Sequence, residues 1–318
     1  MIEARHLGKC FGQEVAVDDI SFTVDRGEVL GFLGPNAAGK TTTMRMITGF
    51  LPPTSGTAII GGDDISESSL SARKKIGYLP ENAPVYPDMT VLGFIDFIAE
   101  IRGFSGAEKK QRVEDTLERC FLSGVRFQTI NTLSKGFKQR VCFAQSILHD
   151  PAYLIMDEPT DGLDPNQKHE VRAMIREMAR EKTIILSTHI LEEAAAVCTR
   201  AIIIADGRIV ADDTPDRLKA RSSVHGAVCF TVQRVAEENL VQEVQRIPGV
   251  KTVEVLNETE AYATVRAYPD EAMAPPADRI VRYFLEKDRP VKSLFVEEGR
   301  LEDVFRMITT SHSKEAQS

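Results

Sequence analysis

Short apolar runs alternate with longer amphipathic segments over the first two thirds of the chain. The runs Ile20–Val24 and Glu28–Leu33 flank a Gly-containing turn signal and predict two strands, and a helix is expected from about 40 to 50. Three later runs are almost wholly apolar, as is typical of strands buried on both faces of a parallel sheet: Tyr153–Met156, Thr183–Ser187 and Ala201–Ile204. Strands that alternate with helices predict an α/β layered domain.

The pattern changes near residue 220. Beyond it, the periodicity predicts strands at 227–233, 250–256, 260–267 and 291–296, and helices at 235–246 and 277–287. The order βαββαβ suggests a small ferredoxin-like α+β domain. A last helix would carry four apolar residues on one face: Leu301, Val304, Phe305 and Ile308. We therefore expect two domains, at 1–220 and 221–318.

Composition narrows the classes of protein to which the chain can belong. Its 318 residues correspond to about two domains, and 39 basic against 47 acidic residues give a net charge of −8. That charge argues against binding to nucleic acid through bulk electrostatics. The apolar stretches fall short of the roughly 18 residues of a membrane span, and the start of the chain predicts no secretory signal. Five cysteines without a CxxC pair are typical of a reducing cytoplasm.

The first chemical motif is GPNAAGKT at 34–41, which fits the phosphate-binding pattern G-x-x-x-x-G-K-[ST]. It follows an apolar strand and opens a helix, so that backbone N–H groups and the helix dipole converge on a phosphate. We expect Lys40 to contact the β- and γ-phosphates of a nucleotide and Thr41 to ligate Mg²⁺. A Gly-rich turn without a ligand is the alternative, which the flanking strand and helix disfavour.

The second motif is a pair of carboxylates at the end of a buried strand. In YLIMDEP, at 153–159, Asp157 and Glu158 lie where an α/β sheet places its active site. We expect Asp157 to hold Mg²⁺ and Glu158 to act as the general base that directs water at the γ-phosphate. Such a pair standing alone could be a solvated strand end. The phosphate loop favours the catalytic interpretation.

A third motif points to a family. LSKGFKQR at 133–140 opens a helix shortly before the acidic strand, and its Leu-Ser-x-Gly core resembles the signature motif of ATP-binding cassette (ABC) ATPases. DGLDP at 161–165 resembles the D-loop of that family, His189 its switch histidine, and Phe11, upstream of the first sheet, its adenine-stacking aromatic. The order and spacing extend the resemblance over roughly residues 1–220. Taken alone, His189 and Phe11 could be ordinary core residues.

The resemblance implies a fold and a set of site residues. The fold is that of a P-loop NTPase, with a mixed sheet core and a helical subdomain at about 85–150. The implied catalytic residues are Glu158, His189 and Lys40, and the implied Mg²⁺ ligands are Thr41, Glu81 and Asp157. The implied ATP-binding residues are Phe11, Gly34, Asn36, Ala37, Ala38, Gly39, Lys40, Thr41, Thr42, Ser134, Gly136 and Asp164.

Two positions depart from the commonest pattern of the family. Ala37 stands where Gly is usual, and if the loop needs a positive φ there, alanine costs on the order of 1 kcal/mol. Glu81 stands where most members have Gln. A carboxylate can still ligate Mg²⁺, but it adds negative charge beside the phosphates. We expect altered metal affinity and retained activity.

Within the family, the sequences at 31–33, 75–82, 133–137 and 301–305 resemble those of the ATPase subunits of bacterial ABC-2-type exporters, most nearly the gliding-motility-associated subgroup. This implies an ATPase that is peripheral on the cytoplasmic face of the inner membrane and contacts a separate transmembrane permease around Glu81–Asp88. Two subunits, a homodimer or a pair of paralogues, would meet head to tail with ATP between them. The alternatives are a soluble ABC ATPase that acts outside transport and a nucleotide-gated regulatory scaffold. The 221–318 domain is expected to serve self-association and regulation.

Overall fold

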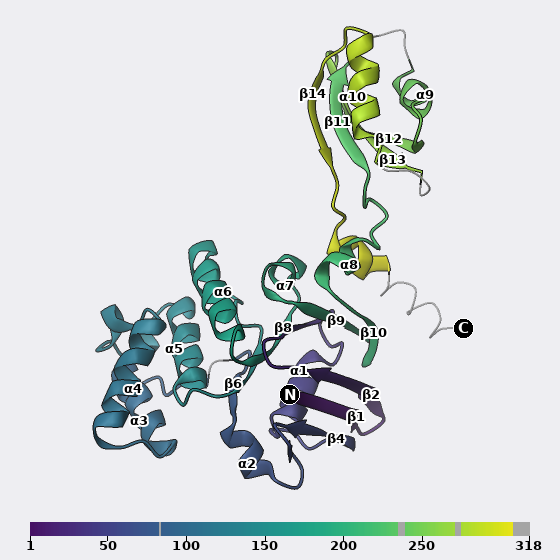
Figure 1. Cartoon of the computed structure of the whole chain (residues 1–318). Helices are drawn as coiled ribbons and strands as arrows, with labels where there is room; N and C mark the ends of the chain where they lie inside the picture. The colour runs from purple at the N-terminus through teal and green to yellow at the C-terminus, as the bar shows by residue number, and fades with distance from the viewer. Residues whose placement is uncertain (83, 235–238, 271–274, 308–318) are drawn as a thin grey trace. The chain divides into compact units, whose positions relative to one another are not determined.

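The computed structural model describes residues 1–82, 84–234, 239–270 and 275–307. The chain forms two compact units, Met1–Pro215 and Asp216–Ser318, and each is described by itself (Figure 1). The sequence predicted a boundary near residue 220. No helix of the described residues is long and apolar enough to cross a membrane.

A six-stranded sheet forms the centre of the first unit, in the order β10-β9-β3-β8-β7-β6. Its strands are β3 (Val29–Leu33), β6 (Ile76–Leu79), β7 (Tyr153–Asp157), β8 (Thr183–Thr188), β9 (Arg200–Ala205) and β10 (Arg208–Asp213). The pairs from β9 to β6 are parallel and β10 is antiparallel, so the predicted mixed sheet is confirmed. Every residue of β3 and β8 is buried, which explains their continuous apolar runs.

A second, antiparallel sheet packs in the same unit, in the order β2-β1-β4-β5. It contains β1 (Ile2–Phe11), β2 (Glu14–Val24), β4 (Ser55–Ile60) and β5 (Asp63–Asp64). The sequence had predicted only the last five residues of β2. Phe11 pairs with Glu14 at the end of β1, so the expectation that it lies upstream of the first sheet was wrong. Helix α1 (Lys40–Ile47) and both sheets contribute to one hydrophobic core.

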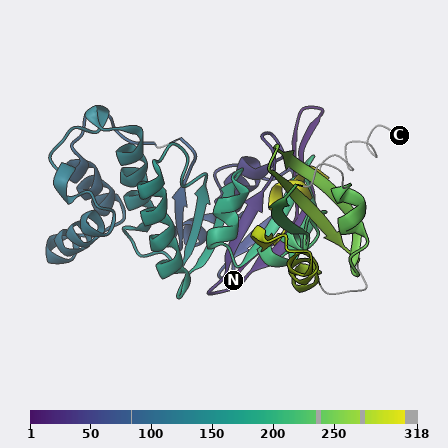
Figure 2. The ribbon, with the colours of Figure 1, turned by 90° about the horizontal axis from the view of Figure 1, so that it is seen from above.

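Helices surround the six-stranded sheet and also form a separate layer to one side of it. That layer, the predicted helical subdomain, holds α3 (Val91–Ile101), α4 (Gly106–Arg119) and α5 (Lys135–Ile147), and both views show it beside the sheet (Figures 1 and 2). The remaining helices of the unit are α2 (Ser69–Lys74), α6 (Pro165–Ala179) and α7 (Leu191–Val197). Two short 3₁₀ turns, Ser123–Val125 and Ile130–Thr132, precede α5.

The second unit begins with α8 (Pro215–Lys219) and then follows the order β11, α9, β12, β13, α10, β14. These are β11 (Val228–Gln233), α9 (Leu240–Gln245), β12 (Val250–Glu258), β13 (Tyr262–Pro269), α10 (Ala277–Glu286) and β14 (Val291–Val296). The sheet order β12-β13-β11-β14, antiparallel throughout, is ferredoxin-like, as predicted. Residues 301–307 form the expected last helix, with Leu301 and Val304 buried. Ile308 and residues 235–238 lie outside the described residues.

Candidate active site

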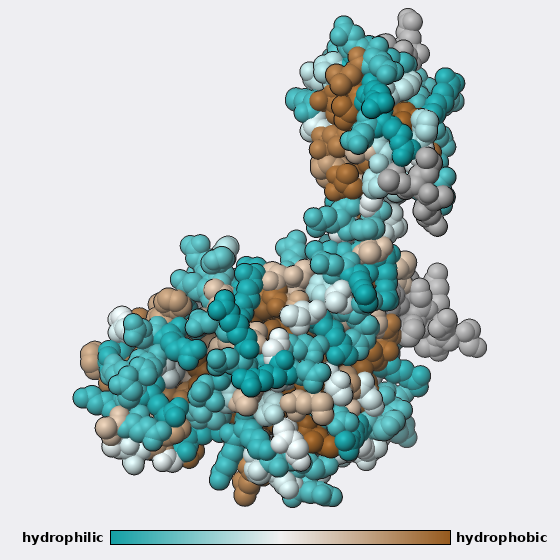
Figure 3. Space-filling view, viewed as in Figure 1, coloured by the Kyte–Doolittle hydropathy of each residue, from teal (hydrophilic) through white to brown (hydrophobic). Residues whose placement is uncertain are grey.

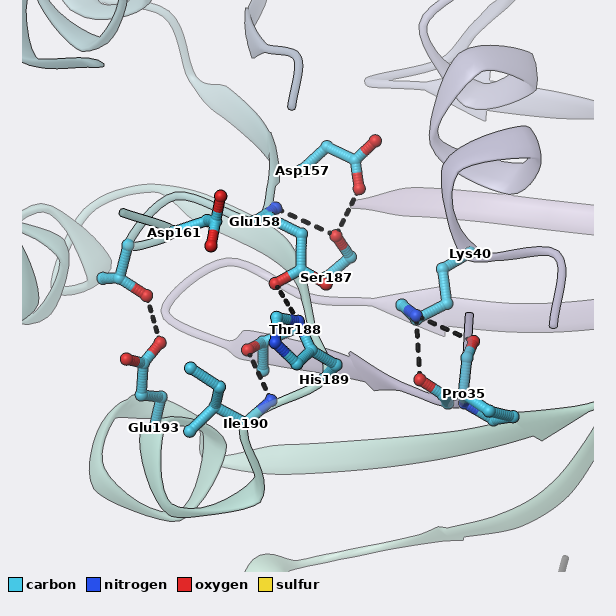
Figure 4. Close-up of polar contacts among 12 residues, drawn as sticks. Pro35, Lys40, Asp157, Glu158, Asp161, Ser187, Thr188, His189, Ile190 and Glu193 are labelled. Carbon is cyan, nitrogen blue, oxygen red and sulfur yellow. Dashed lines mark hydrogen bonds and ion pairs between the residues drawn. The ribbon is translucent and has the colours of Figure 1, made fainter. Parts of the chain in front are cut away.

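The phosphate-binding segment joins the buried end of β3 to the start of α1. Gly39 has φ 103°, and a Cβ atom at this position would lie 2.6 Å from the carbonyl oxygen of Ala16, so glycine is required. Lys40 follows as the first residue of α1, and its Nζ donates to the carbonyl oxygens of Gly34 at 2.8 Å and Pro35 at 3.0 Å (Figure 4). Burial lowers the pKa of Lys40, an effect opposed by the charges of Glu158, Asp157 and Glu81.

Ala37 has φ 64°, in the left-handed region that favours glycine. The phosphate loop therefore does need a positive φ at this position, where alanine replaces the usual glycine. The alanine carries backbone strain of about 1 kcal/mol. The neighbouring Ala38 is not among the residues with positive φ. The strain is thus confined to one of the two alanines.

A cavity of about 290 Å³ opens beside the phosphate loop. Its lining contains eight of the predicted site residues: Asn36, Ala37, Gly39, Lys40, Thr41, Thr42, Glu81 and Glu158. It also contains Ala16, which sequence reasoning missed, because only the folded chain brings β2 against the loop. Gly34 and Ala38 belong to the same loop without lining the cavity, and a Cβ at Gly34 would lie 2.6 Å from the carbonyl oxygen of Ile204.

Asp157 ends β7 and is 1% exposed. Its Oδ1 accepts a hydrogen bond from the Ser187 hydroxyl at the end of β8, whereas its Oδ2 is buried without a partner (Figure 4). An orphaned, buried carboxylate oxygen is costly unless a cation satisfies it. Asp157 does not itself line the cavity, whereas the other two predicted Mg²⁺ ligands, Thr41 and Glu81, do. A few oxygen ligands from the protein fit Mg²⁺, which takes its other ligands from phosphates and water; within the described residues, no three or more His, Cys, Asp or Glu form a group that could hold a metal ion by themselves.

Glu158 follows Asp157 and faces His189, the predicted switch histidine. His189 Nδ1 lies 3.0 Å from Glu158 Oε2, so the structure brings this predicted pair together (Figure 4). Burial raises the pKa of Glu158, and the His189 contact opposes that rise. The residue has φ 51°, and its backbone N–H donates to the Ser187 hydroxyl oxygen at 3.1 Å. A non-glycine residue held at positive φ in a cleft is typical of functional sites.

Ser187 is therefore a second residue that sequence reasoning left outside the site. Its hydroxyl donates to Asp157 and accepts from the backbone of Glu158. The available signal was a hydroxyl residue at the end of the strand next to the acidic one, just before His189. By contrast, Phe11 is 50% exposed, which excludes the alternative of an ordinary core aromatic, and Lys9 Nζ lies 5.3 Å from its ring centroid.

The predicted signature residues lie outside the cavity lining. Ser134 caps α5 and accepts from the backbone N–H of Phe137 at 3.4 Å. Asp164 caps α6 in a capping box with Gln167, and a Cβ at Gly136 would lie 2.3 Å from Gln167 Oε1. Lys135 Nζ pairs with Asp161 at 2.8 Å. The signature segment, residues 133–140, thus contacts the loop that follows Glu158 through the Lys135–Asp161 pair, and its Ser134 and Gly136 do not line the cavity beside the phosphate loop.

The fold and the site define the class of protein: a nucleotide-binding ATPase of the P-loop type. The ABC transporter family model matches residues 17–161. The chain is 34% identical over 310 residues to the Nod factor export ATP-binding protein I of Paraburkholderia xenovorans, a match that covers 97% of this chain and 96% of that protein. It is 38% identical over 224 residues to the probable multidrug ABC transporter ATP-binding protein YbhF of Escherichia coli, but the match spans only 39% of that protein and 70% of this chain.

Solved structures agree with these relatives. A structure described as the ATP-binding subunit of an ABC transporter superposes with a TM-score of 0.64 at 31% identity, and covers 70% of this chain and 92% of that one. The chain therefore belongs to the family of ABC transporter ATP-binding proteins. The fold class predicted from sequence is confirmed.

Proposed function

We propose that this protein binds and hydrolyses ATP to power export through a separate transmembrane permease. The observation that carries the proposal is the contact of Glu158 with His189 at the edge of a cavity lined by Lys40 and the phosphate loop. A scaffold that only binds nucleotide would not need this pair. The relatives named for Nod factor export and multidrug transport support export over other uses of the fold.

Hydrolysis needs a base, a charge clamp and a fixed direction of attack. Glu158 accepts a proton from water as the water oxygen attacks the γ-phosphorus, and the bond to the departing ADP oxygen breaks. Its raised pKa brings it nearer to the pH of the cell, which suits a general base. His189 would hydrogen-bond the γ-phosphate and position the attacking water together with Glu158. Lys40 gives up its bonds to the carbonyl oxygens of Gly34 and Pro35 to pair with the phosphates.

Mg²⁺ would be held by Thr41, Asp157 and Glu81, because the unpartnered oxygen of Asp157 and the two cavity-lining side chains supply oxygen donors. When bound, it would neutralise charge on the phosphates. The exposed ring of Phe11 would stack on adenine, as it does in the family that the motifs resemble. Gly34, Asn36, Ala37, Ala38, Gly39 and Thr42 would contribute the loop that surrounds the phosphates.

Two copies of the chain would complete each site. Ser134, Gly136 and Asp164 do not line the cavity, yet Ser134 and Gly136 lie at the N-terminus of α5, where backbone N–H groups favour an anion. Head-to-tail pairing would bring these groups to the γ-phosphate held by the other copy. Because one chain carries both the phosphate loop and the signature motif intact, a homodimer would have two complete sites.

The permease would contact the surface around Glu81–Asp88. Tyr86 is 56% exposed, and its ring packs edge-on against Phe94 and Phe97, 6.1 and 5.7 Å away between ring centroids. A rigidly held, exposed aromatic suits docking. Tyr86→Ala should uncouple transport while basal ATPase activity persists. If both survive, the docking site lies elsewhere. Such docking would place the chain on the cytoplasmic face of the inner membrane.

For the second unit we propose self-association and regulation of the dimer. Strand β14 is an edge strand of its sheet and exposes Phe295 and Val296, and apolar side chains gather on that side of the unit (Figure 3). An unpaired, apolar edge is a ready interface for a second copy. Phe295→Lys should weaken dimerisation in the absence of ATP, as sedimentation would measure.

The test of the proposed function is a steady-state ATPase assay of the whole chain with Glu158→Gln as its control. Activity in the wild type and its loss in the variant, with ATP binding intact, would support the enzyme. Binding without hydrolysis in both would favour the scaffold. Co-purification with a polytopic membrane protein would separate an exporter subunit from a soluble ABC ATPase that acts outside transport.

A further inference from the structure

A buried link joins the loop that carries Glu158 to the helix that follows His189. Thr160, two residues after Glu158, is 4% exposed, and its hydroxyl donates to Oε2 of Glu193 on α7. Glu193 is itself 7% exposed, and its other oxygen pairs with Lys168 Nζ on α6 at 2.7 Å. Figure 4 shows the Glu193 carboxylate directed at the loop beyond Asp157.

Burying a carboxylate costs free energy unless both of its oxygens have hydrogen-bond or ion-pair partners. The hydroxyl and the ammonium satisfy both here. The three partners come from three separate segments: the loop after β7, α6 and α7. The link therefore fixes the distance between those segments, which a local cap or turn bond would not do.

Glu158 lies between two anchors of its loop. On its N-terminal side, its backbone N–H is held by Ser187 at the end of β8. On its C-terminal side, Thr160 is held by Glu193. Since Glu158 has φ 51°, a conformation that persists only where its surroundings enforce it, the loss of one anchor would let the residue relax.

We propose that Thr160 and Glu193 are positioning residues for hydrolysis, which hold the Glu158 and His189 segments at the separation that the reaction needs. This rests on the proposed ATPase function. Neither residue lines the cavity, so the link would act on the chemical step and leave nucleotide binding to the phosphate loop. Misplacement of a catalytic group by about 1 Å can cost on the order of 10²-fold in rate.

The experiment compares Thr160→Val, which keeps the side-chain shape and removes the hydroxyl, with Thr160→Ser, which keeps the hydroxyl. Thr116→Val, at a buried threonine on α4, is the matched control. We expect Thr160→Val to lower kcat by about tenfold with KM for ATP within about threefold, Thr160→Ser to restore most of the rate, and Thr116→Val to behave as the wild type. If Thr160 had only a structural role, Thr160→Val would lower thermal stability without lowering kcat at a nearly unchanged KM.

A second comparison keeps the test decisive if Thr160→Val does not fold. The double variant Glu193→Met with Lys168→Met removes both charges together, which buried ion pairs often tolerate. Lys168→Gln alone leaves the bond from Thr160 to Glu193 and keeps a hydrogen-bond donor for the other oxygen of Glu193. We expect the double variant to lose about tenfold in kcat and the single variant to stay within about threefold.

The proposal is overturned if Thr160→Val folds and keeps kcat within about twofold, if Thr160→Ser is as impaired as Thr160→Val, or if Lys168→Gln and the double methionine variant have equal rates. These outcomes presuppose an active wild type. A wild type that binds ATP without hydrolysing it would contradict the proposed function instead, so the two failures are distinguishable.

Discussion

The phosphate loop and the signature segment both lie at helix N-termini and carry recognisable motifs, yet only the phosphate loop lines the cavity. The phosphate loop lines a cavity together with Glu81 and Glu158, within one chain. The signature segment is braced on the loop after Glu158 by the Lys135–Asp161 pair and by the contact of Gly136 with Gln167, and its Ser134 lies outside that cavity. We propose that the phosphate loop binds ATP within its own chain, and that the signature segment completes the site of a second copy.

The largest expected effect is that of Gly136→Asp, which should impair the signature segment and leave ATP binding by the phosphate loop intact. Gly136→Asp places a carboxylate where we propose that the γ-phosphate of the partner arrives, and we expect at least a 100-fold loss of ATPase activity from charge repulsion, on the order seen when one transition-state contact is removed. The side chain of Gln167, which a Cβ would meet, can swing away, so folding should survive. Binding of ATP to the single chain, measured by calorimetry, should stay unchanged.

Gly124→Asp is the matched control, since a Cβ at this position in the helical subdomain meets nothing within 4 Å. Equal losses in Gly124→Asp and Gly136→Asp would contradict the assignment of the signature segment. A loss of ATP binding in Gly136→Asp would show that the phosphate loop and the signature segment are not separate.

A smaller effect is expected from Glu81→Gln on the phosphate-loop side. The change removes one negative charge from the cavity, so ATPase activity should stay within about tenfold and the Mg²⁺ concentration for half-maximal rate should rise, because a neutral amide attracts the cation less. A titration with Mg²⁺ measures this, with the exposed Glu67→Gln as control. Complete loss of activity would contradict the account of Glu81.

Lys135→Ala should have a weaker effect on the signature side. The pair with Asp161 is well exposed and contributes at most about 1 kcal/mol to stability, so the thermal midpoint should hardly move. We expect kcat to fall by about threefold because the ion pair that holds the loop after Glu158 is lost. Asp161→Asn should match it, and the double variant should be no worse than either single one. Additive losses would mean that the two side chains act independently.

The smallest effect concerns stability alone. Ala37→Gly removes a left-handed alanine and should raise the free energy of unfolding by up to about 1 kcal/mol, as measured by urea denaturation. Ala38→Gly, at the neighbouring residue without a positive φ, should instead lower it. Changes of the same sign would contradict the strain assigned to Ala37.

The two sheets of the first unit differ in how much of them could be predicted from the sequence. Four of the five parallel strands, β3, β7, β8 and β9, are largely apolar runs, and their predicted ends fell within about a residue of those observed; β6 was not predicted. The antiparallel sheet was largely missed because β1 mixes buried and exposed residues and its pairing with β2 shifts register. Helix α1 stopped short of the predicted end because Gly49 has φ 68°.

Within the site, motifs predicted eight of the residues that line the cavity beside the phosphate loop, because phosphate binding would fix their spacing in the sequence. They did not identify Ala16, Ser187 or Glu193, whose roles come from contacts with distant segments. The sequence shows that alanine replaces a usual glycine at position 37, but only the structure shows that its φ is positive.

The central claim is that each ATP site is built from two chains, and mixing two inactive variants tests it most directly. Lys40→Ala disables the phosphate loop, and Gly136→Asp disables the signature segment. In a mixed dimer, the intact phosphate loop of one chain faces the intact signature segment of the other. We expect an equimolar mixture to recover up to about a quarter of wild-type ATPase activity, although each variant alone is inactive, because half of the dimers are mixed and each has one complete site. A mixture that stays as inactive as its components would contradict the claim.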